Sequence, residues 1–166
     1  MIVEKELFMT KLNETRKIFI YLPDDYETSN KQYPVLYAFD GHNIFLDAHA
    51  TYGKAIHIQQ HIEKLGIDMI VVGQECSHVG NNRLKEYAPY SFYDPEYGSF
   101  EGQGEETMDF FVHELKPYID DHYRTKKTRK NTFIGGSSCG GLMALYAAYA
   151  YSNVYSKAIV ISPYVL

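Results

Sequence analysis

The chain has 166 residues, of which 45% are apolar and 22% charged, and 16 Lys and Arg against 21 Asp and Glu give a formal net charge of −5. These values are typical of one folded domain and exclude a disordered chain or a basic nucleic-acid surface. No apolar run reaches the roughly 18 residues of a membrane span, and the N-terminus lacks a secretory pattern, so we expect no membrane partner. Two cysteines, Cys76 and Cys139, make no disulfide framework, and we therefore expect a cytoplasmic protein.

The first elements along the chain are predicted strands. Alternating apolar residues predict a half-buried strand over 17–22, with residues 2–8 as its antiparallel partner. Four continuous apolar runs are typical of strands that are buried on both faces of a parallel sheet. These runs cover residues 34–39, 68–72, 131–134 and 157–161.

Helical patterns fill the gaps between these strands. Apolar residues at spacings of three and four predict helices over 58–65 and 108–119, and residues 139–151 are rich in helix-forming residues. Residues 76–104 have no clear period and are predicted to form a long loop. The alternation of strands and helices predicts an α/β fold, with a mostly parallel sheet covered by helices on both faces.

The most informative segment is the turn between the strand at 131–134 and the helix at 139–151. Gly136, Ser138 and Gly140 form the Gly-x-Ser-x-Gly pattern of a nucleophile elbow. A sharp turn projects the serine hydroxyl from the end of the sheet, and the flanking positions are too crowded for a Cβ. The backbone N–H of Cys139 then opens the helix and is a candidate oxyanion donor.

Other interpretations of this turn are possible. A dinucleotide fingerprint is excluded because Ser138 stands where its second glycine is required, and a phosphate loop is excluded because Leu142 stands where its lysine is required. A Gly-Ser turn that only connects strand and helix is the remaining structural alternative. Ser137 is the adjacent candidate nucleophile but lacks the flanking glycines, and the Cys139 thiol is less favoured.

A second candidate segment, Asp40-Gly41-His42-Asn43, directly follows the strand at 34–39. In hydrolases with this elbow, the loop after the corresponding strand supplies the second oxyanion N–H, and we assign it to the amide of His42. Asp40, Gly41 and Asn43 are candidate substrate-binding residues, although for Asp40 we favour a buried carboxylate that holds the loop. The imidazole of His42 is expected to line the pocket rather than to act as a base.

The long loop contributes further candidates. Arg83, Glu86 and Tyr87 form either a rim on the substrate side or an ion pair with aromatic packing that braces the loop, and bracing is favoured. Residues 89–93 either line an acyl or alcohol pocket or cover the sheet.

An ordered series of motifs resembles the esterase D / enterochelin-esterase branch of the α/β-hydrolases. The series consists of Ile20-Tyr21-Leu22-Pro23, Tyr33-Pro34-Val35-Leu36-Tyr37, Asp40-Gly41-His42-Asn43-Ile44-Phe45, Ile70-Val71-Val72-Gly73, Arg83-x-x-Glu86-Tyr87-x-Pro89, Glu114-Leu115-x-Pro117-x-Ile119, Tyr123-Arg124-Thr125, Gly136-Ser137-Ser138-Cys139-Gly140-Gly141 and Ile161-Ser162-Pro163. The resemblance implies a serine esterase that acts on a small-molecule carboxylic ester or thioester, with Ser138 as nucleophile and the amides of His42 and Cys139 as oxyanion donors.

One feature departs from the family pattern. The acid and the base of α/β-hydrolases follow the serine in the chain, but no Asp, Glu or His follows Ser138. We therefore expect residues 1–166 to be the N-terminal portion of a single α/β-hydrolase domain that lacks its last two strands. Such a fragment is expected to show little triad-dependent turnover, and to self-associate or swap strands through the apolar edge at 157–161.

The sequence also leaves alternatives for the function. An upstream histidine could replace the missing base, and the candidates are His42, His49, His57, His61, His78, His113 and His122. His57 and His61 have the i, i+4 spacing of metal ligands on a helix, but the rest of the zincin pattern is missing, and we expect neither a metal nor an organic cofactor. A non-catalytic binding or assembly domain and an acyltransferase with the same elbow are the alternative functions.

Overall fold

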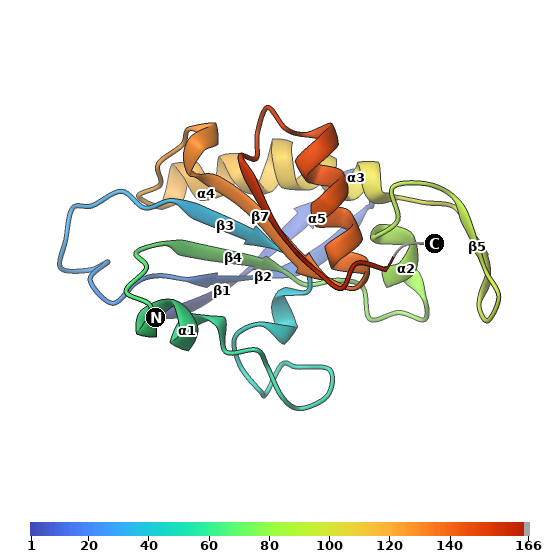
Figure 1. Ribbon diagram of the computed structural model, residues 1–166, viewed down its shortest axis with the longest axis horizontal. Helices are drawn as coiled ribbons and strands as arrows, with labels where there is room; N and C mark the ends of the chain where they lie inside the picture. The colour runs from blue at the N-terminus through green and yellow to red at the C-terminus, as the bar shows by residue number, and fades with distance from the viewer. Residues whose placement is uncertain (165–166) are drawn as a thin grey trace.

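The computed structural model describes residues 1–164 as a twisted six-stranded sheet with helices on both faces (Figure 1). The strands of this sheet, in spatial order, are β1 (Ile2–Met9), β2 (Glu14–Tyr21), β4 (Ile70–Gln74), β3 (Val35–Ala38), β7 (Thr132–Ser137) and β8 (Lys157–Ile161). The helices are η1 (Gly41–Asn43), α1 (Ile58–Lys64), α2 (Asn82–Glu86), α3 (Gly104–Asp109), η2 (Phe110–Leu115), α4 (Lys116–His122), η3 (Arg129–Asn131) and α5 (Cys139–Ala150). A separate two-stranded hairpin contains β5 (Phe92–Asp94) and β6 (Gly98–Phe100).

The pairing of the strands confirms the predicted fold class. β1 and β2 are antiparallel, and β2 pairs antiparallel with β4. The remaining pairs, β4 with β3, β3 with β7 and β7 with β8, are all parallel. Parallel strands have their carboxyl ends on the same side. The loops that follow β3, β4 and β7 therefore meet at the carboxyl end of the sheet.

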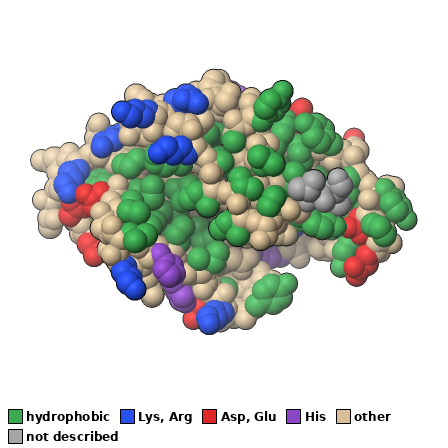
Figure 2. Space-filling model, viewed as in Figure 1, with side chains coloured by type: hydrophobic (Ala, Val, Ile, Leu, Met, Phe, Trp, Pro, Cys, Tyr) green, Lys and Arg blue, Asp and Glu red, His purple; other side chains and the backbone are tan. Residues whose placement is uncertain are grey.

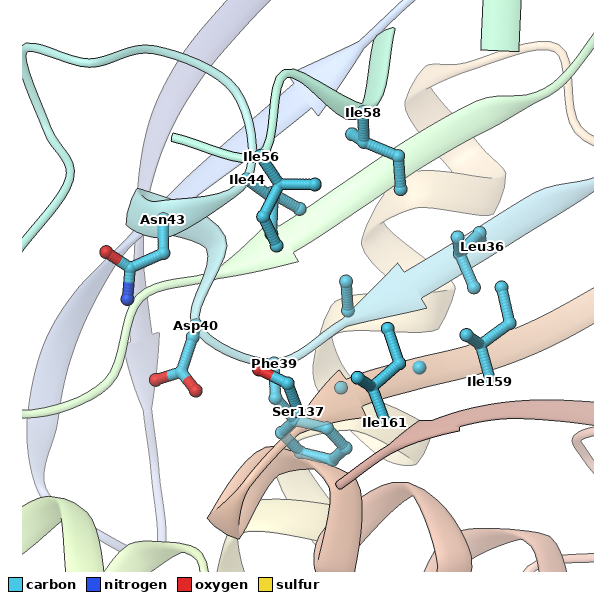
Figure 3. A pocket seen from close by; sticks show the side chains of 13 residues that line it. Leu36, Phe39, Asp40, Asn43, Ile44, Ile56, Ile58, Ser137, Ile159 and Ile161 are labelled. Atoms are coloured by element: carbon cyan, nitrogen blue, oxygen red, sulfur yellow. The ribbon is translucent and has the colours of Figure 1, made fainter. Parts of the chain in front are cut away.

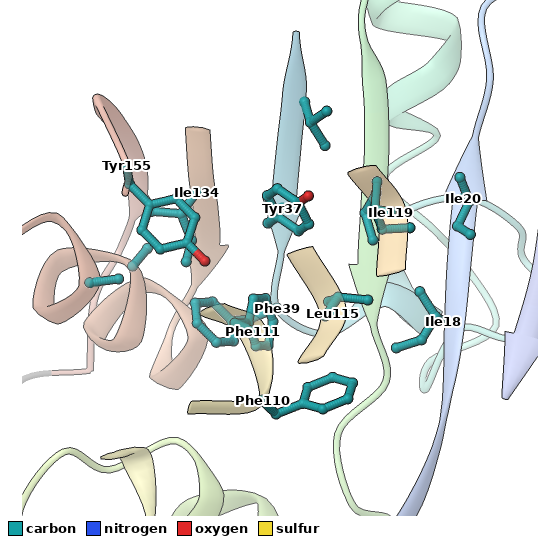
Figure 4. Packing of buried hydrophobic residues seen from close by; sticks show 14 of the residues in the cluster. Ile18, Ile20, Tyr37, Phe39, Phe110, Phe111, Leu115, Ile119, Ile134 and Tyr155 are labelled. Atoms are coloured by element: carbon teal, nitrogen blue, oxygen red, sulfur yellow. The ribbon is translucent and has the colours of Figure 1, made fainter. Parts of the chain in front are cut away.

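Alternate residues of the central strands face two hydrophobic clusters, one on each side of the sheet. On one side, Tyr37 and Ile134 pack against α5 and against the helical segment that contains α3, η2 and α4 (Figure 4). The rings of Phe39 and Phe111 lie 4.7 Å apart at their centroids in this layer. On the other side, Leu36 belongs to a smaller cluster with residues of η1 and α1. Helices therefore cover both faces of the sheet, as predicted.

The helix predicted over 108–119 is longer than expected, because α3, η2 and α4 follow one another from Gly104 to His122. Its middle, η2, is a π-helical segment. Phe110 and Phe111 are both buried there, although they are consecutive. A wider turn changes which residues face the core, and this allows two adjacent aromatic rings to pack inward.

The prediction that residues 76–104 form a loop without regular structure is wrong, because the segment contains α2 and the β5–β6 hairpin. These elements span only three to five residues each and are too short for a helical or strand period to show. The end of the segment is fixed by backbone hydrogen bonds from Gln103 to Lys85 and from Gly104 to Ala88.

The last strand, β8, lies at the edge of the sheet. Among residues 1–164, β8 pairs only with β7. Ile159 and Ile161 on this strand are 48% and 51% exposed, and hydrophobic side chains gather over the middle of the face seen in Figure 2. Self-association through this edge stays a prediction. No helix among residues 1–164 combines the length and the hydrophobicity that crossing a membrane requires.

Candidate active site

The turn between β7 and α5 has the geometry of a nucleophile elbow. Ser138 lies between the last residue of β7 and the first residue of α5, with φ 54° and ψ −123°. This is a conformation that a non-glycine residue rarely adopts, and strain of this kind is typical of functional sites. The Ser138 amide donates a hydrogen bond to the carbonyl of Ile161, and its carbonyl accepts one from Leu142, each at 3.0 Å. These bonds hold the strained turn in place and leave the Ser138 side chain exposed.

The crowding of this turn explains its first glycine. A Cβ on Gly136 would lie closer than 3.0 Å to backbone atoms of Gly140, the second residue of α5. A side chain at position 136 would therefore force the strand and the helix apart. Steric contact therefore requires a glycine at the first position of the Gly-x-Ser-x-Gly pattern.

The loop after β3 forms the opposite wall of the site. Asp40 has φ 56° in the left-handed region, and Gly41 begins the 3₁₀ turn η1 directly after it. A Cβ on Gly41 would lie closer than 3.0 Å to the backbone of Gly73 in β4, so this loop packs directly on the neighbouring strand. Among the loop and cap hydrogen bonds of residues 1–164, none is donated by the amide of His42 or of Cys139. Both amides thus remain available for an oxyanion.

An ion pair and a buried tyrosine hold the Asp40 loop. Arg83 donates two hydrogen bonds to the Asp40 carboxylate, from Nε to Oδ1 at 2.8 Å and from Nη2 to Oδ2 at 2.7 Å. The Tyr87 hydroxyl accepts a hydrogen bond from the Asp40 amide at 3.1 Å and donates one to Gln74 Oε1 at 2.8 Å. Burial raises the pKa of Tyr87 well above its usual value, so its hydroxyl stays protonated. Asp40, Arg83 and Tyr87 therefore position the backbone that precedes His42.

Glu86 lies on the other side of this brace. Its carboxylate forms an ion pair with Arg16 of β2, and it also accepts a hydrogen bond from the Ser77 amide at 3.0 Å. The side chains of Arg16 and Glu86 are 7% and 5% exposed. Glu86 thus braces the loop from within the protein and does not form a substrate rim.

A cavity of about 520 Å³ lies beside the elbow. It is lined by Asp40, His42, Asn43, Thr51, Tyr52, Cys76, Ser77, His78, Gly80, Arg83, Ser137 and Ser138. The cavity therefore brings together the elbow, the Asp40 loop and the loop after β4. Of the candidate catalytic and binding residues that the sequence singled out, four do not line it: Gly41, Glu86, Tyr87 and Cys139.

A smaller apolar pocket, of about 110 Å³, adjoins this cavity, because Asp40, Asn43 and Ser137 line both. Figure 3 shows Ile56 and Ile58 on one side of the pocket and Ile161 of β8 on the other. The Asn43 carboxamide at its end accepts a hydrogen bond from the Thr51 amide at 2.8 Å. Asn43 therefore fixes the loop that carries Thr51, which lines the larger cavity.

Two of the seven histidines, His42 and His78, line the cavity with Ser138. Burial lowers the pKa of His42, so its imidazole is neutral at pH 7. Neither ring hydrogen-bonds to Ser138 in the described part of the chain. His57 does not share a helix face with His61, because α1 begins at Ile58 and His57 has a left-handed backbone with its Nε2 3.0 Å from Asp47.

Sequence reasoning missed Cys76 and Ser77 of the cavity wall and singled out His78 only as one of seven histidines. Cys76, Ser77 and His78 follow β4, and the carboxyl end of β4 lies beside that of β3. Once a parallel sheet is predicted, the residues after each strand are candidates for the site, and this signal could have found them. Gln74, which connects β4 to Tyr87, could not be found in this way, because its role depends on a contact with a residue that follows α2.

The sheet, the elbow and the loop after β3 together define an α/β-hydrolase fold. A family model described as "Putative esterase" matches residues 9–166, and the chain belongs to this family.

Similar proteins extend beyond the length of this chain. The uncharacterized protein YjcH of Bacillus subtilis is 31% identical over 163 residues, which are 98% of this chain and 61% of that protein. Esterase Rv1288 of Mycobacterium tuberculosis is 32% identical over 139 residues, covering 82% of this chain and 27% of that protein. The crystal structure of an IroE-like serine hydrolase from Shewanella oneidensis has a TM-score of 0.78 at 26% identity, covering 96% of this chain and 50% of that one. The chain thus spans at most about three-fifths of the length of these curated relatives.

Proposed function

We propose that Ser138 is the nucleophile of a serine esterase that forms an acyl-enzyme from a carboxylic ester or thioester. The observation that carries this proposal is the strained backbone of Ser138, which holds its side chain at the end of the parallel sheet and in the wall of a 520 Å³ cavity. Family membership and the name of Esterase Rv1288 support hydrolysis as the reaction class. A further proposal is that residues 1–166 belong to one α/β-hydrolase domain.

The acylation step follows from the groups around Ser138. Its Oγ forms a bond to the carbonyl carbon of the substrate while a base accepts the hydroxyl proton. The carbonyl oxygen becomes negatively charged and takes hydrogen bonds from the amides of His42 and Cys139. The bond to the leaving alcohol or thiol then breaks, the leaving group takes a proton, and the acyl group remains on Ser138. Donors placed in this way lower the barrier, and removing one typically costs about 10²–10³-fold in rate.

In the family the base follows the serine in the chain. Residues 1–166 do not supply a base at that place, because no His follows Ser138. We propose that base and acid come from outside residues 1–166, which agrees with the greater length of the relatives. The adjoining apolar pocket, lined by residues such as Ile44 and Ile161, fits a hydrocarbon portion of the acyl or alcohol group.

A fluorophosphonate probe tests the nucleophile, with Ser138→Ala and Ser137→Ala as matched variants. Because the 166-residue chain lacks the base in the family order, its reaction is slow and is measured with excess probe and long incubation. Under these conditions we expect labelling of the unmodified chain and of Ser137→Ala, and none of Ser138→Ala. Hydrolysis of p-nitrophenyl acetate by the 166-residue chain should not exceed the roughly 10³–10⁴-fold acceleration over water that an oxyanion hole supplies without a triad. Labelling that persists in Ser138→Ala would refute the nucleophile. Turnover at ordinary enzyme rates would place the base within the chain, with His42 and His78 as the residues to substitute.

A further inference from the structure

Three side chains with metal-ligating atoms converge in the wall of the cavity. The ligand atoms of His42, Cys76 and His78 all lie within 4.8 Å of one another. His42 belongs to η1 after β3, whereas Cys76 and His78 follow β4, so the parallel pairing of the two strands brings them together. All three residues line the cavity that contains Ser138.

The distances between these ligand atoms are close to those around a tetrahedrally coordinated ion. Zinc binds sulfur at about 2.3 Å and imidazole nitrogen at about 2.0–2.1 Å, which places neighbouring ligand atoms roughly 3.3–3.6 Å apart. His42 and Cys76 are each 2% exposed and are held by the packing around them. The His78 side chain is 56% exposed and can rotate to close the remaining distance.

The orientation of the His42 ring provides a second, independent observation. Its Nε2 lies 3.1 Å from the Thr51 hydroxyl, while its buried Nδ1 has no hydrogen-bond partner among the described residues. A buried nitrogen without a partner costs free energy, and most such atoms in folded proteins are satisfied. A neutral imidazole with one nitrogen held by an oxygen atom offers its other nitrogen to a metal ion.

His78 has a similar outer partner. Its Nε2 lies 3.1 Å from Glu75 Oε1, a carboxylate–imidazole contact of the kind that orients metal-ligating histidines. The His42 and His78 rings pack edge to face, with centroids 4.7 Å apart. The two imidazoles are thus adjacent, and each has an oxygen partner outside the cluster.

We propose that His42, Cys76 and His78 bind a zinc ion in the cavity wall. One thiolate and two imidazoles suit Zn²⁺, whereas Mg²⁺ and Ca²⁺ prefer oxygen ligands. The Cys76 thiol loses its proton to solvent when its sulfur binds the ion. Three protein ligands leave a fourth position open toward the cavity, as in zinc sites that take a water molecule or a substrate atom. The site depends on the cavity wall and not on the reactivity of Ser138.

Titration with Co²⁺, a spectroscopic substitute for Zn²⁺, tests this site in chelator-treated 166-residue protein. We expect saturation at one equivalent, with a sulfur-to-cobalt charge-transfer band in the near ultraviolet that added Zn²⁺ removes. Cys76→Ser should abolish the band, whereas Cys139→Ala, which removes the other cysteine, should keep it. His78→Ala alters an exposed side chain and should weaken binding at least 10-fold, while the control His61→Ala, on α1, should leave binding unchanged.

The absence of saturable binding, or equal weakening in His78→Ala and His61→Ala, would overturn the proposal. A sulfur band that is lost in Cys139→Ala and kept in Cys76→Ser would overturn it as well. If Cys76→Ser does not fold, the comparison of His78→Ala with His61→Ala decides. Fluorophosphonate labelling of Ser138 is measured separately on metal-free protein, so failure of the zinc site is distinguishable from failure of the esterase proposal.

Discussion

Removal of the Arg83 guanidinium tests the brace of the Asp40 loop quantitatively. Arg83→Met keeps the apolar stem of the side chain but leaves the Asp40 carboxylate, which is 8% exposed, without its two charge-assisted hydrogen bonds. Breaking a fully buried ion pair costs about 3–5 kcal/mol. The Arg83 side chain is 31% exposed, so water reaches the vacated position and reduces this cost. We therefore expect unfolding free energy to fall by about 2–3 kcal/mol.

Urea unfolding measures this change as a lower midpoint with an unaltered slope. Lys11→Met is the matched control, because Lys11 pairs with Asp109 on the surface, and its midpoint should stay unchanged. Adding Asp40→Asn to Arg83→Met removes the unpaired carboxylate charge. The unfolding free energy of the double variant should therefore be about 1 kcal/mol higher than that of Arg83→Met. A loss below about 0.5 kcal/mol, or strictly additive effects in the double variant, would refute the reasoning, since contacting residues are expected to couple.

Gly136→Ala should lower the unfolding free energy by about 3 kcal/mol and abolish probe labelling, because its Cβ would overlap the Gly140 backbone; normal labelling would contradict this. Tyr37→Phe removes a buried hydroxyl without a described partner and should raise stability by up to about 1 kcal/mol in thermal unfolding, whereas a clear loss would count against it. Hydrogen bonds, chiefly from the Tyr97 amide, lower the pKa of Asp94, so its stabilising contribution is complete above about pH 4 and is lost as the pH falls. In Asp94→Asn, the unfolding free energy should fall less steeply as the pH is lowered below about 4. An unchanged pH dependence of stability in this range would argue against it.

The parts of the fold that could be predicted are those with a strong local signal. The buried strands have continuous apolar runs, and the antiparallel pairing of β1 with β2 follows from two neighbouring strands joined by a short turn. The elbow could be predicted because steric crowding makes its glycines obligatory. The elements within 76–104 could not, since each is short and is held by contacts with other segments, such as the bond from Thr107 Oγ1 to the Glu86 carbonyl.

The candidate site shows the same division. Ser138 and the Asp40 loop lie in local sequence patterns, and these patterns occur in the same order as in the family that the chain resembles. The Arg16–Glu86 pair joins residues 70 positions apart, and no spacing in the sequence indicates it. No spacing in the sequence predicts the proposed zinc site either, because its residues come from two loops that only the parallel pairing of β3 and β4 brings together.

The crystal structure of the protein after reaction with a fluorophosphonate tests the central claim most directly. We predict a phosphonate bonded to Ser138 Oγ, with one of its oxygen atoms about 3 Å from the amides of His42 and Cys139. A phosphonate bonded to Ser137 or to another residue would contradict the account. So would an adduct on Ser138 whose oxygen atoms lie away from both amides.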